Sequence, residues 1–229
     1  MKHGLPDSHV SAASQQMKVR DLGVVGYRQA HELQLQCVEA QIAKAEGEQV
    51  LLLEHPSVFT LGSSGKRESL LRSAEAIIGK GAEIVHTERG GDITYHGPGQ
   101  LVVYPIINLR RRNLPVSSFI ELLEEMMLLT AADVGVAAHR DARNRGIWVG
   151  DNKIGSVGIR IRRGISFHGL SLNVNLALEP FSWIRPCGLD GVGVSSLAIE
   201  GGRAVDMEEV KSIMQRYIRT FLDDGVAGQ

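Results

Sequence analysis

Apolar residues recur at helical spacing early in the chain. Residues 27–45 contain no glycine or proline and place Leu33, Cys37, Ala40 and Ile42 at helix-compatible positions. Such a stripe buries one face of a helix while the other face stays in water. The pattern predicts an amphipathic helix over 27–45.

Two further helices are predicted nearer the C-terminus. The first is expected to begin near Ser118, because Ser118 and Glu121 have the spacing of a capping box, and to end at Gly135. The other is expected to begin at Asp206, with Glu209 three residues later. Both segments carry apolar residues at helical spacing: Ile120, Leu123, Met127 and Val134 in the first, and Val210, Ile213, Met214, Tyr217 and Phe221 in the second.

Short apolar runs between the helices are typical of strands. Residues 49–56 (QVLLLEHP) form one such run, which Pro56 closes. Two more candidates, at 81–91 and 99–109, flank a segment rich in glycine and proline at 90–99. We expect three strands here, with the segment 90–99 as a loop.

Residues 145–176 alternate apolar and polar positions around two turn signals, Gly150-Asp151-Asn152 and Arg163-Gly164. This pattern predicts an antiparallel meander. Strands and helices do not alternate strictly, so we expect an α+β fold in a single domain, with a mixed or antiparallel sheet flanked by helices. The domain is expected over 18–226, after an N-terminal extension, residues 1–17, that we expect to be disordered.

Composition narrows the class of protein without identifying it. Of the 229 residues, 43% are hydrophobic and 22% are charged, which is ordinary for a globular domain. The 25 basic and 26 acidic side chains give a net charge of −1, so no basic surplus favours nucleic acid. No apolar run reaches the roughly 18 residues of a membrane span, and the first residues do not resemble a signal peptide. We therefore expect a cytoplasmic protein that binds neither nucleic acid nor membrane.

The two cysteines, Cys37 and Cys187, differ in their surroundings. In a reducing cytoplasm both are expected as free thiols, and without CxxC or HExxH spacing we expect no metal site. Cys37 falls in a predicted helix, which is typical of a small, inert core residue. Cys187 stands between Pro186 and Gly188, an irregular and exposed setting that favours a reactive thiol. Its spacing alone leaves both readings open.

The segment Arg89–Gln100 (RGGDITYHGPGQ) contains four glycines and one proline. Glycines let a loop approach a ligand closely, and Arg89, Tyr95 and His96 supply hydrogen-bond donors. A tight structural loop explains the composition equally well. The segment matches neither GxxxxGK[ST] nor GxGxxG, which weakens a nucleotide-binding interpretation.

The segment Lys153–Ser171 (KIGSVGIRIRRGISFHGLS) begins with a lysine beside a predicted turn. Lys153 could be aimed at a ligand from a rigid strand, although a single lysine is usually a solvated surface charge. His168 could be a buried core histidine or a functional one. Three arginines alternate with apolar positions, and two of the three are expected to face solvent or an acidic partner: Arg160, Arg162 and Arg163.

Taken together, four segments resemble the lipoyl(octanoyl) transferase family, which belongs to the biotin/lipoate protein ligase fold superfamily. These segments are EHPSVFTLG at 54–62, RGGDITYHGPGQLVVYPI at 89–106, KIGSVGIRIRRGISFHGLSLNVNLALEPF at 153–181 and PCG at 186–188. They occur in the family's order and spacing, and they are too long to agree by chance.

The resemblance implies an acyltransferase that catalyses the first step of endogenous protein lipoylation. Such an enzyme takes an octanoyl group from octanoyl-acyl carrier protein, holds it as a thioester on Cys187, which pairs with Lys153, and passes it to a lysine of a lipoyl domain. The implied acceptors are the lipoyl domains of 2-oxoacid dehydrogenase complexes and the glycine cleavage H protein. No cofactor is implied, and we expect a monomer. The residues that match the family's substrate-binding segments are Arg89, Gly90, Gly91, Asp92, Ile93, Thr94, Tyr95, His96, Ser156, Val157, Gly158, Gly169, Leu170 and Ser171.

Elementary chemistry agrees with this implied pair. A free thiol with a pKa of about 8.5 is only a few per cent ionised at neutral pH, and a nearby ammonium favours the thiolate. Once the thiol is acylated, Lys153 can lose its proton and accept one from the incoming amine. Because transfer from a thioester to an amine runs downhill, ATP is not needed. Main-chain N–H groups of 156–158 or beside Cys187 are candidate oxyanion donors, and Gly155, Gly158 and Gly169 are expected to leave space for the acyl chain.

Two departures and two alternatives qualify this interpretation. Asp92 stands where the family commonly has Gln, and Arg185 replaces an Asn, so we hypothesise a compensating ion pair between them. An ATP-dependent lipoate or biotin ligase of the same fold would not need Cys187. A non-catalytic module that only binds carrier proteins would have lost Cys187 or Lys153, and both are present.

Overall fold

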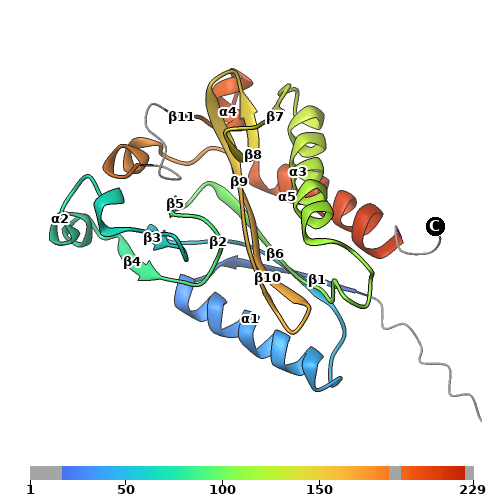
Figure 1. Ribbon diagram of the computed structural model, residues 1–229. Helices are drawn as coiled ribbons and strands as arrows, with labels where there is room; N and C mark the ends of the chain where they lie inside the picture. Colours follow the sequence, from blue (N-terminus) through green and yellow to red (C-terminus); the bar gives the residue numbers. More distant parts are fainter. Residues whose placement is uncertain (1–16, 186–191, 225–229) are drawn as a thin grey trace, which may run out of the picture.

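The computed structural model describes residues 17–185 and 192–224. In these residues the chain forms a large mixed sheet, a small sheet and five α-helices (Figure 1). The large sheet runs in the order β1 (Lys18–Val24), β2 (Gln49–Glu54), β6 (Gln100–Ile106), β10 (Ile165–Asn173), β9 (Asn152–Arg162), β8 (Asn144–Val149) and β7 (His139–Asp141), with β11 (Gly193–Val194) beside β9. The small sheet has the order β4 (Glu83–His86), β3 (Val58–Leu61) and β5 (Ile93–His96).

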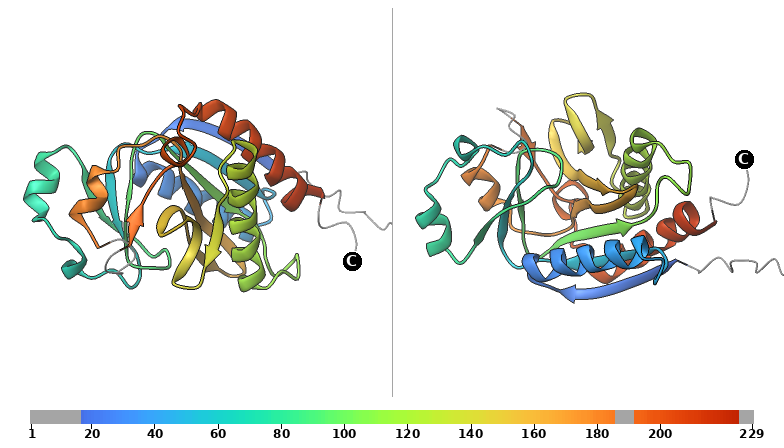
Figure 2. Two further views of the ribbon diagram at one scale, coloured as in Figure 1. Left: turned by 90° about the horizontal axis from the view of Figure 1, so that it is seen from above. Right: turned by 60° about the horizontal axis from the view of Figure 1, so that its bottom comes forward.

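Four of the five helices cover the faces of the large sheet, and the second helix of the chain packs on the small sheet. They are α1 (Tyr27–Ile42), α2 (Ala74–Gly79), α3 (Val116–Asp133), α4 (Leu197–Glu200) and α5 (Met207–Ile218), which continues into a π-helical turn at Arg219–Asp224. Short 3₁₀ turns occur at Arg67–Ser69 and Glu179–Trp183. Figure 2 shows α1 lying along one side of the sheet, while α3 and α5 lie on the other.

Strand β2 shows why the sheet needs cover on both faces. Side chains alternate along a strand, so Val50 and Leu52 enter the core beneath α3 and α5, whereas Leu51 and Leu53 enter the core beneath α1. All four are fully buried. A strand buried on both sides is a continuous apolar run, which is how this segment appears in the sequence.

The small sheet has a separate core of its own. Phe59 of β3 and Tyr95 of β5 pack against Phe181 and Trp183, which follow β10 in the chain. Parallel pairing of β3 with β4 and antiparallel pairing with β5 hold the three strands together. This core fixes the small sheet beside the large one.

Most of the long elements match their predictions. The helix predicted over 27–45 is α1, the meander is β8–β9–β10, and α5 has Asp206 as its N-cap, with the carboxylate accepting from Glu208 N. The turn between β9 and β10 places Arg163 and Gly164 at positive φ, as predicted for a two-residue hairpin turn. The predicted α+β architecture in one domain is confirmed.

The predicted start of α3 is wrong. The helix begins at Val116 rather than near Ser118, because the Pro115 carbonyl already accepts from Phe119 N at 2.9 Å. Ser118 therefore lies inside the first turn and caps nothing. The predicted end is confirmed, since α3 ends at Asp133 and Gly135 follows with φ +86°.

The prediction that 90–99 is a loop is also wrong, because it contains β5. Strands β1 and β3 and helix α2 were not predicted either. No helix in the described part of the chain is long and apolar enough to cross a membrane. The expected extension lies outside the described residues except for Met17, which is 5% exposed and packs in the larger core.

Candidate functional site

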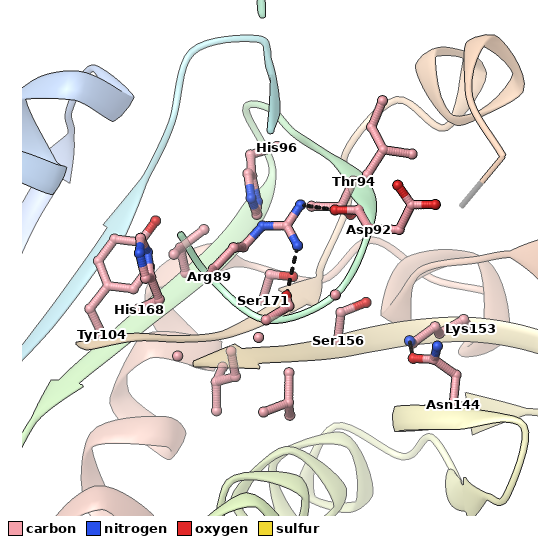
Figure 3. Close-up of a pocket in the computed structure, with 18 of the residues that line it drawn as sticks. Arg89, Asp92, Thr94, His96, Tyr104, Asn144, Lys153, Ser156, His168 and Ser171 are labelled. Atoms are coloured by element: carbon pink, nitrogen blue, oxygen red, sulfur yellow. Dashed lines mark hydrogen bonds between the residues drawn. The ribbon is translucent and has the colours of Figure 1, made fainter. Parts of the chain in front are cut away.

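A cavity of about 250 Å³ lies between the large sheet and the segment that joins β4 to β5 (Figure 3). Its floor is formed by β9 and β10 and its cover by residues 89–94. All the predicted substrate-binding residues except Tyr95 line it, together with Lys153. Sequence reasoning did not assign the remaining lining residues to the site: Tyr27, Ser64, Val102, Tyr104, Asn144 and His168.

Arg89 organises the cover of the cavity. Its guanidinium donates to the Thr60 hydroxyl at 2.9 and 3.0 Å and to the Thr60 carbonyl at 2.5 Å. It also donates to the carbonyls of Gly90 and Asp92, at 3.0 and 2.8 Å. Main-chain bonds from Gly62 and Ser63 hold the same segment. Arg89 thus fixes the glycine-rich segment to β3 while lining the cavity.

His96 begins a chain of hydrogen bonds that crosses the sheet. Its Nδ1 donates to Gln100 Oε1 at 2.7 Å, Gln100 Nε2 donates to Asn173 Oδ1 at 2.9 Å, and Asn173 Nδ2 donates to the Ser195 carbonyl at 2.8 Å. Burial lowers the pKa of His96 to about 3, so the ring is neutral at physiological pH. This series of hydrogen bonds links β5 and β10 to the segment after β11.

Lys153 lies at the opposite end of the cavity from Tyr104 and His168 (Figure 3). It is 5% exposed, and its ammonium donates to Asn144 Oδ1 at 2.7 Å and lies 5.5 Å from the centre of the Trp148 ring. A buried lysine is rare without a partner. The interpretation of Lys153 as a solvated surface charge is therefore wrong.

The other end of the cavity is closed by neutral rings. The Tyr104 hydroxyl lies 2.8 Å from His55 Nε2, and since His55 Nδ1 donates to the Val25 carbonyl, Nε2 accepts from Tyr104. Burial lowers the pKa of His55 to about 4 and that of His168 to about 3. His168 adopts φ +55° and is 1% exposed, with no hydrogen-bond partner for Nε2 among the described residues.

Tyr95 does not line the cavity. Neighbouring residues of a strand point to opposite faces, so Thr94 and His96 face the cavity while Tyr95 packs against Phe59, and its hydroxyl is hydrogen-bonded to the Ser57 hydroxyl at 3.1 Å. Thr94 and His96, which flank it, do line the cavity. Tyr95 belongs to the core of the small sheet.

Two of the three glycines expected to open the cavity have another role. A Cβ at Gly155 would lie 2.8 Å from Met127 Sδ, so this position faces the core beneath α3. A Cβ at Gly169 would lie 2.1 Å from the Val103 carbonyl, which shows that Gly169 permits close packing on β6. Only Gly158 faces the cover, where a Cβ would lie 3.0 Å from the Gly90 carbonyl.

One group among the described residues could offer three metal ligands. His31, Glu88 and His168 each place one ligand atom within 4.8 Å of the others. His31 Nε2 lies 3.1 Å from the Glu88 carboxylate, so these two side chains already pair with each other. The Arg89 guanidinium lies close enough to lower the pKa of His168, and its positive charge would repel a bound metal ion. We therefore assign no metal to this group, of which only His168 lines the cavity.

Cys187 lies outside the described residues, but the segments on either side of it are placed. Before it, Arg185 N donates to the Ser69 carbonyl at 2.9 Å, and the Ser69 hydroxyl donates to the Asp92 carboxylate at 2.8 Å. Beyond it, β11 pairs with Asn152 and Lys153, and Ser195 N donates to the Lys153 carbonyl. Asp92 and Arg185, two of the positions that depart from the family pattern, both contact Ser69.

Solved structures share this arrangement of elements. A bipartite lipoate protein ligase from Thermoplasma acidophilum, solved in a study of an archaeal lipoylation system, superposes with a TM-score of 0.71. The match covers 90% of this chain and 84% of that one at 15% identity. The fold is therefore the one seen in lipoate protein ligases.

Sequence comparison identifies the family. Residues 26–219 match the family model of the lipoyl protein ligase A/B catalytic domain, and the chain belongs to this family. The octanoyltransferase of Desulfotalea psychrophila is 50% identical over 195 residues, which cover 83% of this chain and 87% of that protein. The octanoyltransferase of Geotalea uraniireducens is 40% identical over 208 residues, covering 91% and 94%. The predicted family and fold are confirmed.

Proposed function

We propose that this enzyme transfers an octanoyl group from octanoyl-acyl carrier protein to a target lysine of lipoyl domains, through a thioester on Cys187. The acceptors would be the lipoyl domains of 2-oxoacid dehydrogenase complexes and the glycine cleavage H protein, in the cytoplasm. The observation that carries the proposal is the buried Lys153 ammonium at one end of a cavity shaped for a small ligand. The reaction as proposed uses neither ATP nor a cofactor.

The relatives support octanoyl transfer over the ligase alternative. Curated proteins that match most of the chain at 40–50% identity are octanoyltransferases. The solved ligases are only 15% identical to this chain or less, so they support the fold but not the activity. An ATP-dependent ligase is therefore not favoured.

The cavity walls suit an acyl chain. Between its polar ends lie the apolar side chain of Val102 and the glycines Gly158 and Gly169, whereas the side chains of Val157 and Leu170 enter the core beneath α3 and α5. Each buried CH₂ contributes about 0.8 kcal/mol, so burial of an eight-carbon chain there would favour its binding. The cavity volume of about 250 Å³ limits the length of chain that is accepted.

The placement of Lys153 supports its pairing with Cys187. Both segments that flank 186–191 are fixed at the cavity: Arg185 through Ser69 to Asp92, and β11 directly to the backbone of Lys153. In the sequence, Cys187 follows the anchored Arg185 by two residues. An ammonium nearby would favour the thiolate needed for attack on the incoming thioester.

Exposed arginines suit the acidic carrier proteins proposed as donors. Arg160, Arg162 and Arg163 are all exposed around the turn between β9 and β10. Only Arg162 has a described ion pair, with Glu39 at 3.2 Å, and both partners are partly exposed. Positive charge on this turn would speed encounter with a negative carrier and lose effect at high salt.

Intact-mass measurement tests the proposal directly. Incubation with octanoyl-acyl carrier protein should add one octanoyl group to the wild-type protein and none to Cys187→Ala. Cys37→Ala is the matched control and should still be acylated, because Cys37 is buried in α1 and burial raises the pKa of its thiol. Transfer to a lipoyl domain without any adduct on the wild type would overturn the thioester route. Activity with free octanoate and ATP in Cys187→Ala would establish the ligase alternative instead.

A further inference from the structure

Lys153 reaches the cavity across the neighbouring strand. In the hairpin of β8 and β9 it pairs with Trp148, and its side chain then runs past Gly146 toward the start of β8. There its ammonium donates to Asn144 Oδ1 at 2.7 Å, and Figure 3 shows the two groups meeting at one end of the cavity. A side chain from another strand therefore takes part in setting the direction in which Nζ points.

The backbone of Asn144 is itself held in place by the turn before it and by two contacts of its own. A tight turn precedes it, in which Asp141 accepts from the main-chain N–H of Arg143 at 2.8 Å and from its guanidinium at 2.7 and 3.0 Å. Asn144 also pairs with Asp141 across the β7–β8 hairpin. Its carbonyl accepts from Trp148 Nε1 at 3.4 Å. The amide is consequently presented from a fixed backbone.

The acceptor on Asn144 is neutral, which matters for a lysine that must change its protonation state. A carboxylate at this position would stabilise the ammonium and oppose loss of its proton, whereas an amide oxygen accepts one N–H from either the ammonium or the free amine. A neutral Lys153 that donates one N–H to Asn144 still has a lone pair that can accept a proton.

We propose that Asn144 is a positioning residue that orients Lys153 for proton transfer during acyl transfer to the acceptor amine. In that step the amine nitrogen forms a bond to the thioester carbonyl carbon and the C–S bond breaks. The thiolate of Cys187 leaves, and the proton lost by the amine passes to Lys153. The inference rests on the proposed function and adds to it a residue that the family resemblance does not mark.

The test separates the two half-reactions and follows each with pH. The wild type, Asn144→Ala, Asn144→Asp and the control Asn152→Ala are loaded from octanoyl-acyl carrier protein, and transfer to a lipoyl domain is timed in a single turnover. Asn152 neighbours Lys153, but its amide faces Glu200 at 3.5 Å. Asn144→Ala should slow transfer on the order of 10- to 100-fold, because a misplaced acid–base group loses that much. Asn152→Ala should transfer at the wild-type rate.

The pH profile and a double variant distinguish positioning from a purely structural role. Asn144→Asp should move the profile for transfer to higher pH by about one unit, because a carboxylate retains the proton on Lys153. In a Lys153→Ala background, Asn144→Ala should slow the residual rate no further. The inference would be overturned if both Asn144 variants kept the wild-type transfer rate and pH profile. It would also be overturned if Asn144→Ala slowed transfer equally with and without Lys153. Neither result would affect the proposed function. A wild type that forms no adduct would remove the proposed function and this inference together.

Discussion

Gly146 leaves the space through which the Lys153 side chain passes. It adopts φ +129°, and a Cβ there would lie 2.1 Å from the Gly155 carbonyl and 2.8 Å from Lys153 Cε. We expect Gly146→Ala to lower the free energy of unfolding by about 2–4 kcal/mol, from backbone strain and overpacking together. Urea denaturation measures the loss.

Gly150→Ala is the matched control for this prediction. Gly150 also has a positive φ, +54°, but nothing lies within 4 Å of its Cβ position. It should lose only the conformational cost of a left-handed residue, roughly 1–2 kcal/mol. Equal losses in the two variants would show that the contacts with Gly155 and Lys153 do not matter.

Single residues of the site were predictable where their residue type is unusual for its place in the sequence. Lys153 beside a turn and the glycines around Arg89 are visible as unusual residues, and the family resemblance assigned them. Asn144 and Tyr104 are not visible in this way, since an ordinary asparagine or tyrosine becomes part of the site only when distant strands meet. Tyr95 does not line the cavity although the resemblance includes it, because the resemblance identifies a segment and not the face of its strand.

At the scale of elements, Glu124 couples helix α3 to the strand that carries Asn144. Its side chain is 2% exposed and accepts from Gly146 N at 2.8 Å, with Arg140 and Arg145 at 3.3 and 3.6 Å. Glu124→Leu should lower the free energy of unfolding by about 1–3 kcal/mol, because a buried N–H is left without an acceptor. Denaturant titration reports the change.

Glu124→Gln separates the hydrogen bond from the charge. Its amide oxygen can still accept from Gly146 N, so it should lose clearly less stability than Glu124→Leu. Arg140 and Arg145 are half-exposed and remain solvated in both variants. If the two variants lose the same amount, the ion pairs and not the bond to Gly146 connect α3 with β8.

Elements long enough to show several repeats of their hydrophobic period were predictable, whereas short elements and strands with exposed or glycine-rich segments were not. The stripe in α1 and the alternation over β8–β10 extend over enough residues to define their period. Helix α2 spans six residues, too few to show one. Strand β1 is an edge strand with exposed charged positions, and β5 lies within a glycine-rich segment, so neither has the composition of a buried strand.

For the whole molecule, three buried histidines make stability depend on pH. His55, His96 and His168 have pKa values lowered by burial to about 4, 3 and 3, whereas in the unfolded chain each titrates near 6.5. Below pH 6.5 the unfolded chain binds protons that the folded protein does not. The stabilisation is thus complete above about pH 6.5 and is lost as pH falls toward 4.

We therefore expect the free energy of unfolding to fall between pH 6.5 and 4.5, by up to about 1.4 kcal/mol per pH unit for each histidine. Most carboxylates begin to titrate only below this range. Chemical denaturation at a series of pH values measures the slope, and His96→Asn should reduce it. His86, which is exposed on β4, provides the control: His86→Asn should leave the slope unchanged. A flat profile in the wild type would contradict the prediction.

The close approach of backbones around Gly158 and Gly169 also bears on how this enzyme can evolve. Neither position accepts a side chain without moving a carbonyl, that of Gly90 or that of Val103. Substitution there cannot gradually resize the cavity, because the first methyl group already collides with main chain. A change in cavity volume is easier at Val102, whose side chain faces the cavity and can vary in small steps. Inherited variation in the size of the cavity should therefore be found at Val102 rather than at Gly158 or Gly169.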